Sequence, residues 1–117
     1  MVKPLQNSTY REFLLWLLRR RKRLKVKGES MLPLLQPGDE ILFDPYAYKK
    51  SKPQLEDVVV VLHPFQSNLT IVKRIKAIDS GDRYFILGDN QLSSTDSRHW
   101  GKIDLTNIIG RVTSKFT

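Results

Sequence analysis

The chain has 117 residues, which is enough for one domain with its own hydrophobic core and too few for two ordinary domains. Hydrophobic residues make up 40% of it and charged residues 27%, a composition typical of globular proteins. It contains no cysteine, which excludes disulfides, a cysteine nucleophile and thiolate metal ligands. With only two histidines, a multi-histidine metal centre is not expected, and we predict no cofactor.

The formal net charge of +8 lies almost entirely in the first quarter of the chain. Residues 1–30 carry nine basic and two acidic side chains, whereas residues 31–117 carry eleven basic and ten acidic ones. A basic surface over a whole domain is typical of nucleic-acid binding, but here the body is nearly neutral. No aromatic residues interleave with the basic run. We therefore expect no nucleic-acid partner, and a basic adaptor for membranes or nucleic acid is the non-enzymatic alternative.

The N-terminal segment predicts a short helix over about residues 9–24, with Ser8 or Thr9 as its cap and Glu12 in its first turn. Its apolar run, residues 13–18, is six residues long, whereas a membrane-spanning helix needs about 20. The basic residues follow the apolar run, which reverses the order found in a secretory signal. We expect neither a transmembrane segment nor a signal peptide here.

Two roles are open for this helix. It can pack Leu14, Leu17 and Leu18 on the domain as an ordinary terminal helix. Alternatively, it can lie at a membrane surface, with Trp16 at headgroup depth and residues 19–27 facing anionic lipid. In that case residues 11–27 make a weak contact with an anionic membrane. The expected location is cytoplasmic, at most peripheral at the inner membrane.

Beyond residue 36 the pattern is that of β-strands. Turn residues separate short apolar runs at 40–43, 57–62, 69–78, 84–87 and 108–113. The β-branched run 58–61 is typical of a strand buried on both faces, and residues 44–56 of a surface loop. The sequence therefore predicts a mainly β domain over residues 26–117, with residues 1–25 as a basic helical appendage.

Ser30 lies in a turn between the basic segment and the first predicted strand of the body. Gly28 allows close approach of another backbone before it, and Pro33 prevents a long helix after it. A serine on such a turn, with amide groups around it, can act as a nucleophile beside an oxyanion hole. Most serines in Gly/Pro-rich turns are only turn residues, so Ser30 alone decides nothing.

Lys73 is the charged residue of an otherwise apolar strand face. Alternation places it with Ile71, Ile75 and Ala77, while Arg74 lies on the opposite face. Burial disfavours an ammonium ion and lowers its pKa, which is how a lysine becomes a general base. The ordinary alternative is an edge-strand lysine whose amine reaches solvent.

A polar loop over residues 88–101 combines turn residues with many short hydrogen-bonding side chains. It contains Asp96 and Arg98, and such a loop can hold one hydroxyl against a neighbouring group. A plain surface loop is one alternative. A loose metal site through Asp89, Asp96 and His99 is another, but these residues match no common ligand spacing.

Together the three segments resemble the type I signal peptidases, serine proteases with a Ser/Lys dyad. Residues 28–33 with 38–39 resemble the nucleophile box of that family, and residues 72–75 its lysine box. Residues 88–90, 94, 96–98 and 101 resemble its last box. The resemblance covers residues 26–113 and implies a small β fold related to the self-cleaving repressor domains. It also implies an endopeptidase that removes an N-terminal leader from a precursor protein.

The resemblance assigns a role to each motif residue. Ser30 is the nucleophile, its backbone amide donates to the oxyanion, and Lys73 is the general base. Ser94 orients the lysine, and a salt bridge between Asp96 and Arg98 shapes the site. The rim of the nucleophile turn is expected to form small or apolar substrate pockets, and its residues are Met31, Leu34 and Leu35.

Several positions depart from the family pattern. Leu34 replaces the usual threonine, Gly28 replaces a serine that serves some members as a second oxyanion donor, and residues 79–82 replace the usual ending of the lysine box. No large insertion separates the lysine box from the last box, and no membrane anchor is expected. These features are similar to the short bacterial proteases that mature nickel-type superoxide dismutase, whose precursor is then the implied substrate.

Other hydrolases are alternatives. General removal of signal peptides at the membrane uses the same chemistry, as do the self-cleaving repressors. The repressors, however, lack the Gly-Asp-Asn…Asp-Ser-Arg loop found here, and this chain has no helix-turn-helix pattern. A Ser-His-Asp hydrolase could use His63 or His99, but no Gly-x-Ser-x-Gly turn accompanies them.

Overall fold

The computed structural model describes residues 5–116, in which seven strands form one antiparallel sheet. The strands are β1 (Lys22–Lys25), β2 (Glu40–Asp44), β3 (Val58–Leu62), β4 (Thr70–Ile78), β5 (Arg83–Leu87), β6 (Ile103–Asp104) and β7 (Ile108–Phe116). The helices are α1 (Tyr10–Leu17) and α2 (Ser97–Trp100), with single 3₁₀ turns η1 (Gln91–Ser93) and η2 (Leu105–Asn107). The predicted mainly β class with one N-terminal helix is confirmed.

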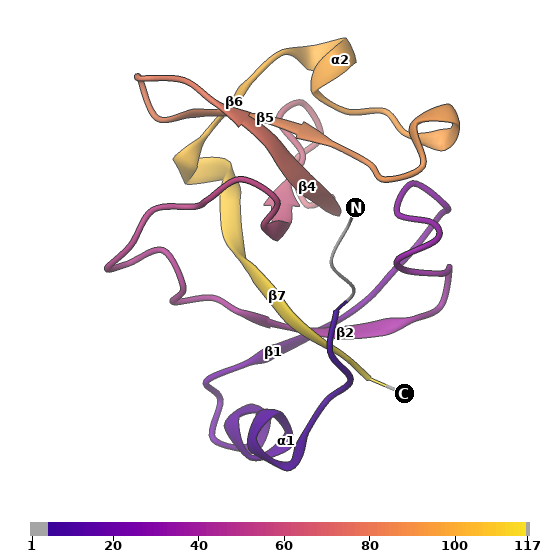
Figure 1. Ribbon diagram of the computed structural model, residues 1–117, viewed down its shortest axis with the longest axis vertical. Coiled ribbons are helices and arrows are strands. Elements are labelled where there is room, and N and C mark those ends of the chain that lie inside the picture. Colours follow the sequence, from indigo (N-terminus) through magenta and orange to yellow (C-terminus); the bar gives the residue numbers. More distant parts are fainter. Residues whose placement is uncertain (1–4, 117) are drawn as a thin grey trace.

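The sheet is curled, and its strand order is β1-β2-β7-β3-β4-β5-β6. The long strand β7 joins the two halves, with β1 and β2 below and β4, β5 and β6 above in the view of Figure 1. Register shifts where β7 meets β2 and β3 mark bulges, which bend a strand and increase its twist. The curl encloses two apolar clusters, one centred on Ile41 and Val60 and the other on Ile75 and Ile86.

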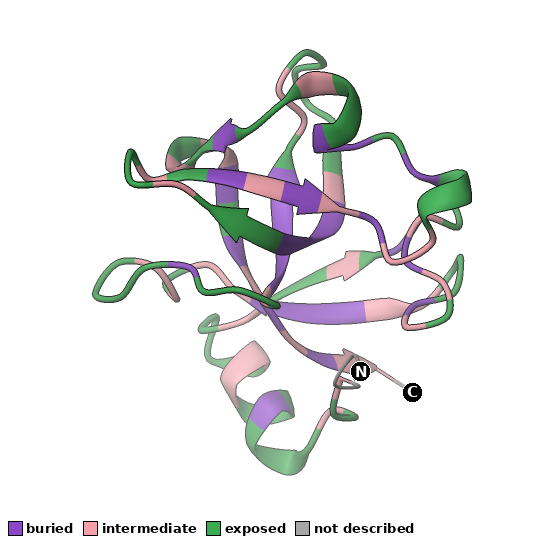
Figure 2. Cartoon of the chain, turned by 45° about the horizontal axis from the view of Figure 1, so that its top comes forward, coloured by how far each residue is buried: buried purple, intermediate pink, exposed green. Residues whose placement is uncertain are grey.

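Burial follows the strands, as Figure 2 shows. The first four residues of β3 are buried without alternation, as its β-branched run predicted, because the two clusters lie on its two faces. The five predicted apolar runs correspond to β2, β3, β4, β5 and β7. Strands β1 and β6 were not predicted, because neither has an apolar pattern: β1 reads Lys-Arg-Leu-Lys and β6 has two residues.

The predicted helix of residues 9–24 is too long. The Thr9 side chain accepts from the Glu12 amide and caps α1 as expected, but the helix ends at Leu17. Arg19 then adopts a positive φ of 62°, and the chain turns into β1. The basic residues of β1 pair with β2 from Lys22 to Lys25, and these backbone hydrogen bonds replace those that a longer helix would have made.

Of the two roles left open for this helix, packing of Leu14, Leu17 and Leu18 on the domain is not found, because all three are exposed. The buried residue of α1 is Glu12. Its carboxylate accepts hydrogen bonds from Arg21 at 3.2 Å, from Ser114 at 3.0 Å and from Thr113. A polar contact therefore fixes the helix to β7. Within residues 5–116, no helix is long and apolar enough to cross a membrane.

Candidate active site

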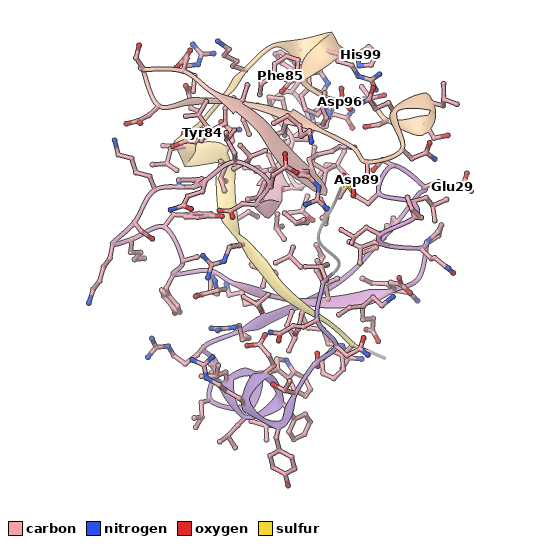
Figure 3. All side chains as sticks on the ribbon, in the orientation of Figure 1. Glu29, Tyr84, Phe85, Asp89, Asp96 and His99 are labelled. Atoms are coloured by element: carbon pink, nitrogen blue, oxygen red, sulfur yellow. The ribbon has the colours of Figure 1, made fainter. Side chains whose placement is uncertain are left out.

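The turn that carries Ser30 is held by the loop after β5. The Asn90 amide donates to the Ser30 carbonyl at 2.8 Å, and the Asn90 side chain donates to the Glu29 carbonyl at 3.1 Å. The Asp89 amide contacts the Met31 sulfur at 3.5 Å. Figure 3 shows Glu29 and Asp89 on these two neighbouring loops. A loop about 60 residues further along the chain thus holds Ser30 and the residues on either side of it.

Lys73 is buried, with 4% of its surface exposed, on the part of β4 that pairs with β3. Its Nζ donates to the Ser94 Oγ at 3.0 Å. Burial lowers the pKa of Lys73 below its ordinary value of 10.5, and the nearby Asp96 carboxylate offsets part of this effect. The amine is therefore held in one orientation, and its neutral form is more accessible than that of a solvated lysine.

Ser94 connects Lys73 to Asp96 through two hydrogen bonds. The Ser94 Oγ donates to Asp96 Oδ2 at 2.6 Å, and the Arg98 Nε donates to Asp96 Oδ1 at 2.9 Å. Burial alone would raise the pKa of Asp96, but hydrogen bonds from Arg98, Ser94 and the Gly88 amide outweigh it and lower the pKa to about 2. Asp96 also caps α2, since its side chain accepts from the Arg98 amide. An ionised carboxylate thus fixes the direction of the Ser94 hydroxyl.

Gly88 brings the serine turn and the lysine support together. A Cβ built on this residue would meet the Ser94 Oγ and would lie 2.6 Å from the Ser30 carbonyl oxygen. Real Cβ atoms do not approach other atoms so closely, so a side chain at this position would displace one neighbour or both. The glycine therefore allows the backbone of Ser30 to approach the hydroxyl that orients Lys73.

Ser30 and Lys73 line the same cleft, which has a volume of about 250 Å³. The cleft lies between the end of β1 with the residues after it and the beginning of β4. Its other lining residues are Leu24, Lys25, Val26, Lys27, Met31, Asn68, Leu69, Thr70, Ile71 and Val72. The chemistry available there is that of a hydroxyl and a buried amine beside an open groove.

The three predicted pocket residues lie in different places. Met31 lines the cleft, although it is almost completely buried. Leu35 is fully buried in the apolar cluster around Ile41, and Leu34 packs against that cluster. Neither leucine is among the residues that line the cleft.

An ion pair behind Lys73 was not predicted. Arg74 donates from Nε and Nη2 to the two oxygens of Asp89, at 2.9 and 3.0 Å, and both side chains are largely buried. A third donor, Nη1, reaches the Glu56 carbonyl at 2.9 Å. The sequence contains both residues in the motif segments, but no spacing rule pairs a strand residue with one in a later loop. The pair joins β4 to the loop that carries Asn90 and Ser94.

The two histidines lie outside the cleft. His63 Nδ1 accepts from the Phe65 and Gln66 amides at the β3–β4 turn, and its ring packs on Trp100. His99 Nδ1 accepts from the Asp96 amide in the capping box of α2. Both imidazoles therefore have local structural partners. Within residues 5–116, no group of three or more His, Asp or Glu side chains gathers in a way that could hold a metal ion.

Comparison with known proteins identifies the family. The family model described as signal peptidase, peptidase S26, matches residues 13–83 and 79–117. Mitochondrial ATP-independent inner membrane protease subunit 1a of Arabidopsis thaliana is 34% identical in an alignment 109 positions long, which covers 74% of this chain and 64% of that protein. Thylakoidal processing peptidase 1 of the same plant is 25% identical in an alignment 132 positions long, which covers 74% of this chain and 39% of that protein.

A bacterial relative is similar over most of its own length. Signal peptidase I V of Bacillus subtilis is 24% identical in an alignment 134 positions long, which covers 74% of this chain and 80% of that protein. By contrast, the chain spans less than two thirds of the two plant proteins. The family match covers the serine turn and strand β4, which line the cleft, and the polar loop, which is hydrogen-bonded to both. The chain belongs to the signal peptidase family, peptidase S26.

Proposed function

We propose that this protein is a serine endopeptidase that removes an N-terminal leader from a precursor protein, with Ser30 as nucleophile and Lys73 as general base. The observation that carries the proposal is the buried amine of Lys73, oriented by Ser94, in the same cleft as Ser30. A hydroxyl and a desolvated amine supply the two groups that acyl transfer requires. Family membership supports the same reaction class.

In this mechanism the neutral Lys73 amine takes the proton of the Ser30 hydroxyl as Oγ attacks the scissile carbonyl carbon. The carbonyl oxygen becomes an oxyanion, to which the Ser30 backbone amide donates. When the peptide C–N bond breaks, the Lys73 ammonium returns its proton to the leaving amine and an ester of Ser30 remains. Lys73 then takes a proton from water, the hydroxide attacks the ester, and the proton returns to the Ser30 oxygen as the acid leaves.

Ser94, Asp96 and Arg98 act as positioning residues in this proposal. Ser94 directs one lone pair to an N–H of Lys73, because its own hydrogen is donated to Asp96. The carboxylate stays ionised at neutral pH because Arg98 and Ser94 hold its pKa at about 2. The lone pair of the neutral amine is thereby left available for the proton of Ser30.

The substrate backbone is proposed to bind as an added strand between two open strand edges. In residues 5–116, β1 is the last strand of the sheet on one side, and β5 pairs only with residues 74–78 of β4. The first half of β4 therefore has an edge without a strand partner in that region, and it faces residues 24–27 across the cleft. Extended peptides bind such edges through main-chain hydrogen bonds.

Lys25 and Lys27 give this groove a positive charge. Both side chains are exposed and line the cleft, whereas Val26 between them is buried, so the two lysines project from the same face of an extended segment. No carboxylate lies among the lining residues. We therefore propose that the leader carries acidic side chains two residues apart on the stretch that binds beside β1.

Matched peptides test this preference. A peptide with two such glutamates is expected to be cleaved about fivefold faster, in kcat/KM, than its glutamine counterpart, since two exposed ion pairs contribute about 1 kcal/mol together. The Lys25→Gln/Lys27→Gln variant should cleave both peptides at the rate of the glutamine peptide. Equal rates with the wild-type protein would refute the charge preference and leave the peptidase proposal standing.

For the precursor itself we propose nickel-type superoxide dismutase. The support is the similarity of the three motif segments to the proteases that mature it, together with the short link of residues 79–87 between β4 and the last motif. General removal of signal peptides is the second candidate, favoured by the similarity to signal peptidase I V of Bacillus subtilis. Incubation of the protein with both kinds of precursor, followed by product masses, decides between them. Cleavage of only a signal-peptide precursor would overturn the first candidate.

We also propose that the protein meets membranes only peripherally, through weak contact of residues 11–27 with anionic lipid. The net positive charge of that segment supports this contact. Cell fractions prepared in low and high salt provide the test. Release by high salt is expected, and recovery only in detergent would contradict it.

A further inference from the structure

Helix α1 presents its apolar side chains to solvent. Tyr10, Phe13, Leu14 and Leu17 follow the i, i+3, i+4, i+7 spacing of a single helix face, and Leu18 extends this face at the C-cap. All five are exposed, with between 43% and 89% of their surface accessible. In an ordinary surface helix this face would cover the core. Here it forms a contiguous apolar surface, which we call the α1 apolar face.

The opposite side of α1 is the one that contacts the protein. At about 100° per residue, Glu12 lies roughly opposite the centre of the α1 apolar face. Its buried carboxylate is bound by Arg21, and Trp16 on the same side packs edge-on against Phe116 with ring centroids 5.7 Å apart. The Arg23 guanidinium lies over the Phe116 ring, with its Cζ 4.7 Å from the ring centroid. Trp16 is thus engaged with the domain, and the helix cannot turn its apolar face inward without breaking these contacts.

The charged side chains that α1 and the residues directly after it expose are all basic. They come from the helix, the turn after it and the first residue of β1, and they are Arg11, Arg19, Arg20 and Lys22. Between residues 5 and 25 the one acidic residue is Glu12, which is buried and paired with Arg21. A second copy of the chain would bring like charges together across such an interface. An anionic lipid surface complements both the apolar face and its basic border.

We propose that the α1 apolar face lies in the headgroup region of an anionic bilayer, with the eight-residue helix parallel to the membrane surface. The docking elements are Tyr10, Phe13, Leu14, Leu17 and Leu18, and the basic border contacts lipid phosphates. This differs from an anchor centred on Trp16. Since β1 begins five residues after α1 and its end lines the cleft, the groove lies close to that surface in a fixed orientation.

Vesicle sedimentation with the intact protein tests the proposal. Wild-type protein is mixed with vesicles of phosphatidylcholine alone or with 30% phosphatidylglycerol (about one third anionic lipid). Binding is expected only to the anionic vesicles and should weaken with salt. Leu14→Glu/Leu17→Glu should reduce the partition coefficient at least tenfold, because it places two carboxylates on the inserted face. Leu55→Glu is the matched control, because Leu55 and Leu17 are equally exposed, each at 57%, and it should bind like wild type.

Each possible result of these experiments either supports or overturns the proposed docking of the α1 apolar face. Thermal unfolding is measured for all variants, and each is expected to be folded, since the altered leucines are exposed. No binding by the wild-type protein, or equal loss in the Leu55→Glu control, would overturn the proposal. Sedimentation equilibrium without vesicles detects the rival occupant: a dimer that Leu14→Glu/Leu17→Glu dissociates would overturn it in favour of a second copy. Cleavage of a soluble peptide, measured in parallel, keeps this result separate from any failure of the peptidase proposal.

Discussion

Replacing Gly88 with alanine should disable the site through geometry alone. The added Cβ would lie 2.6 Å from the Ser30 carbonyl oxygen, which must retreat by about 0.8 Å to reach an ordinary contact of 3.4 Å. The same atom would meet the Ser94 hydroxyl that orients Lys73. A displacement near 1 Å of reacting groups costs about 100-fold in rate, equivalent to about 2.7 kcal/mol of transition-state stabilisation.

The matched control is Gly110→Ala. A Cβ there would also lie 2.6 Å from a carbonyl oxygen, that of Asp44, but on strand β7 and away from the cleft. Overpacking of this kind costs about 1–3 kcal/mol, which corresponds to a fall in Tm of roughly 4–12 °C for a domain of this size. Both variants should therefore lose similar stability.

The assay is kcat/KM on a cleavable peptide, measured well below Tm and normalised to folded protein. We expect Gly88→Ala to lose about 100-fold and Gly110→Ala to stay within about threefold of wild type. If the two variants have similar kcat/KM, the close approach at Gly88 does not matter for the reaction, and the proposed arrangement around Ser30 and Ser94 is refuted.

The remaining predictions concern the dyad and the ion pair behind it. Ser30→Ala and Lys73→Met should each abolish cleavage with the fold intact by circular dichroism, whereas Ser94→Ala should retain partial activity; full activity of Ser30→Ala would end the serine-protease proposal. The wild-type rate should rise with pH through the lowered pKa of Lys73, because only the neutral amine accepts a proton, and a flat profile would contradict this. Arg74→Met should destabilise by about 3–5 kcal/mol in urea unfolding, because it leaves buried Asp89 unpaired, and Arg74→Met/Asp89→Leu should recover part of the loss. Equal loss in the single and double variants would argue against the pair.

The strands of the body were predictable because their apolar runs are separated by strong turn residues. Residues 41–43 and 58–61 are examples: all of them are buried, and Asp39 and Asp44 lie close to the ends of the first run, as Asp57 and Pro64 do for the second. The pattern failed where pairing rather than burial creates the strand. β1 has three basic residues of four, and it is a strand because its backbone pairs with β2 from Lys22 to Lys25.

The N-terminal helix shows a second limit. Its spacing predicted an apolar face correctly, but periodicity does not reveal which face meets the protein. A buried carboxylate decided the outcome: Glu12 has three side-chain donors from Arg21, Thr113 and Ser114, two of them about 100 residues away. Hydrogen bonds to a charged group stabilise by about 1.5–3 kcal/mol, which makes this contact able to compete with burial of a leucine.

Within the site, local motifs indicated the residue types, whereas their contacts depend on the register of one strand. Lys73 and Arg74 are adjacent on β4, both are buried, and they point to opposite faces. Lys73 reaches Ser94 and Arg74 reaches Asp89, and both partners lie in the loop after β5. That loop therefore contacts two consecutive residues of β4.

A slip of β4 by one residue would exchange its two faces. It would place a guanidinium in the cleft, and an arginine cannot act as a general base because it does not lose its proton in proteins. It would also move the Arg74 guanidinium away from Asp89, whose buried carboxylate would lose both hydrogen bonds and its partner charge. The register of β4 that pairs Arg74 with Asp89 is thus the same register that places the Lys73 amine beside the Ser94 hydroxyl. The ion pair on the far face of β4 is therefore a means of placing the lysine, although it lies outside the cleft.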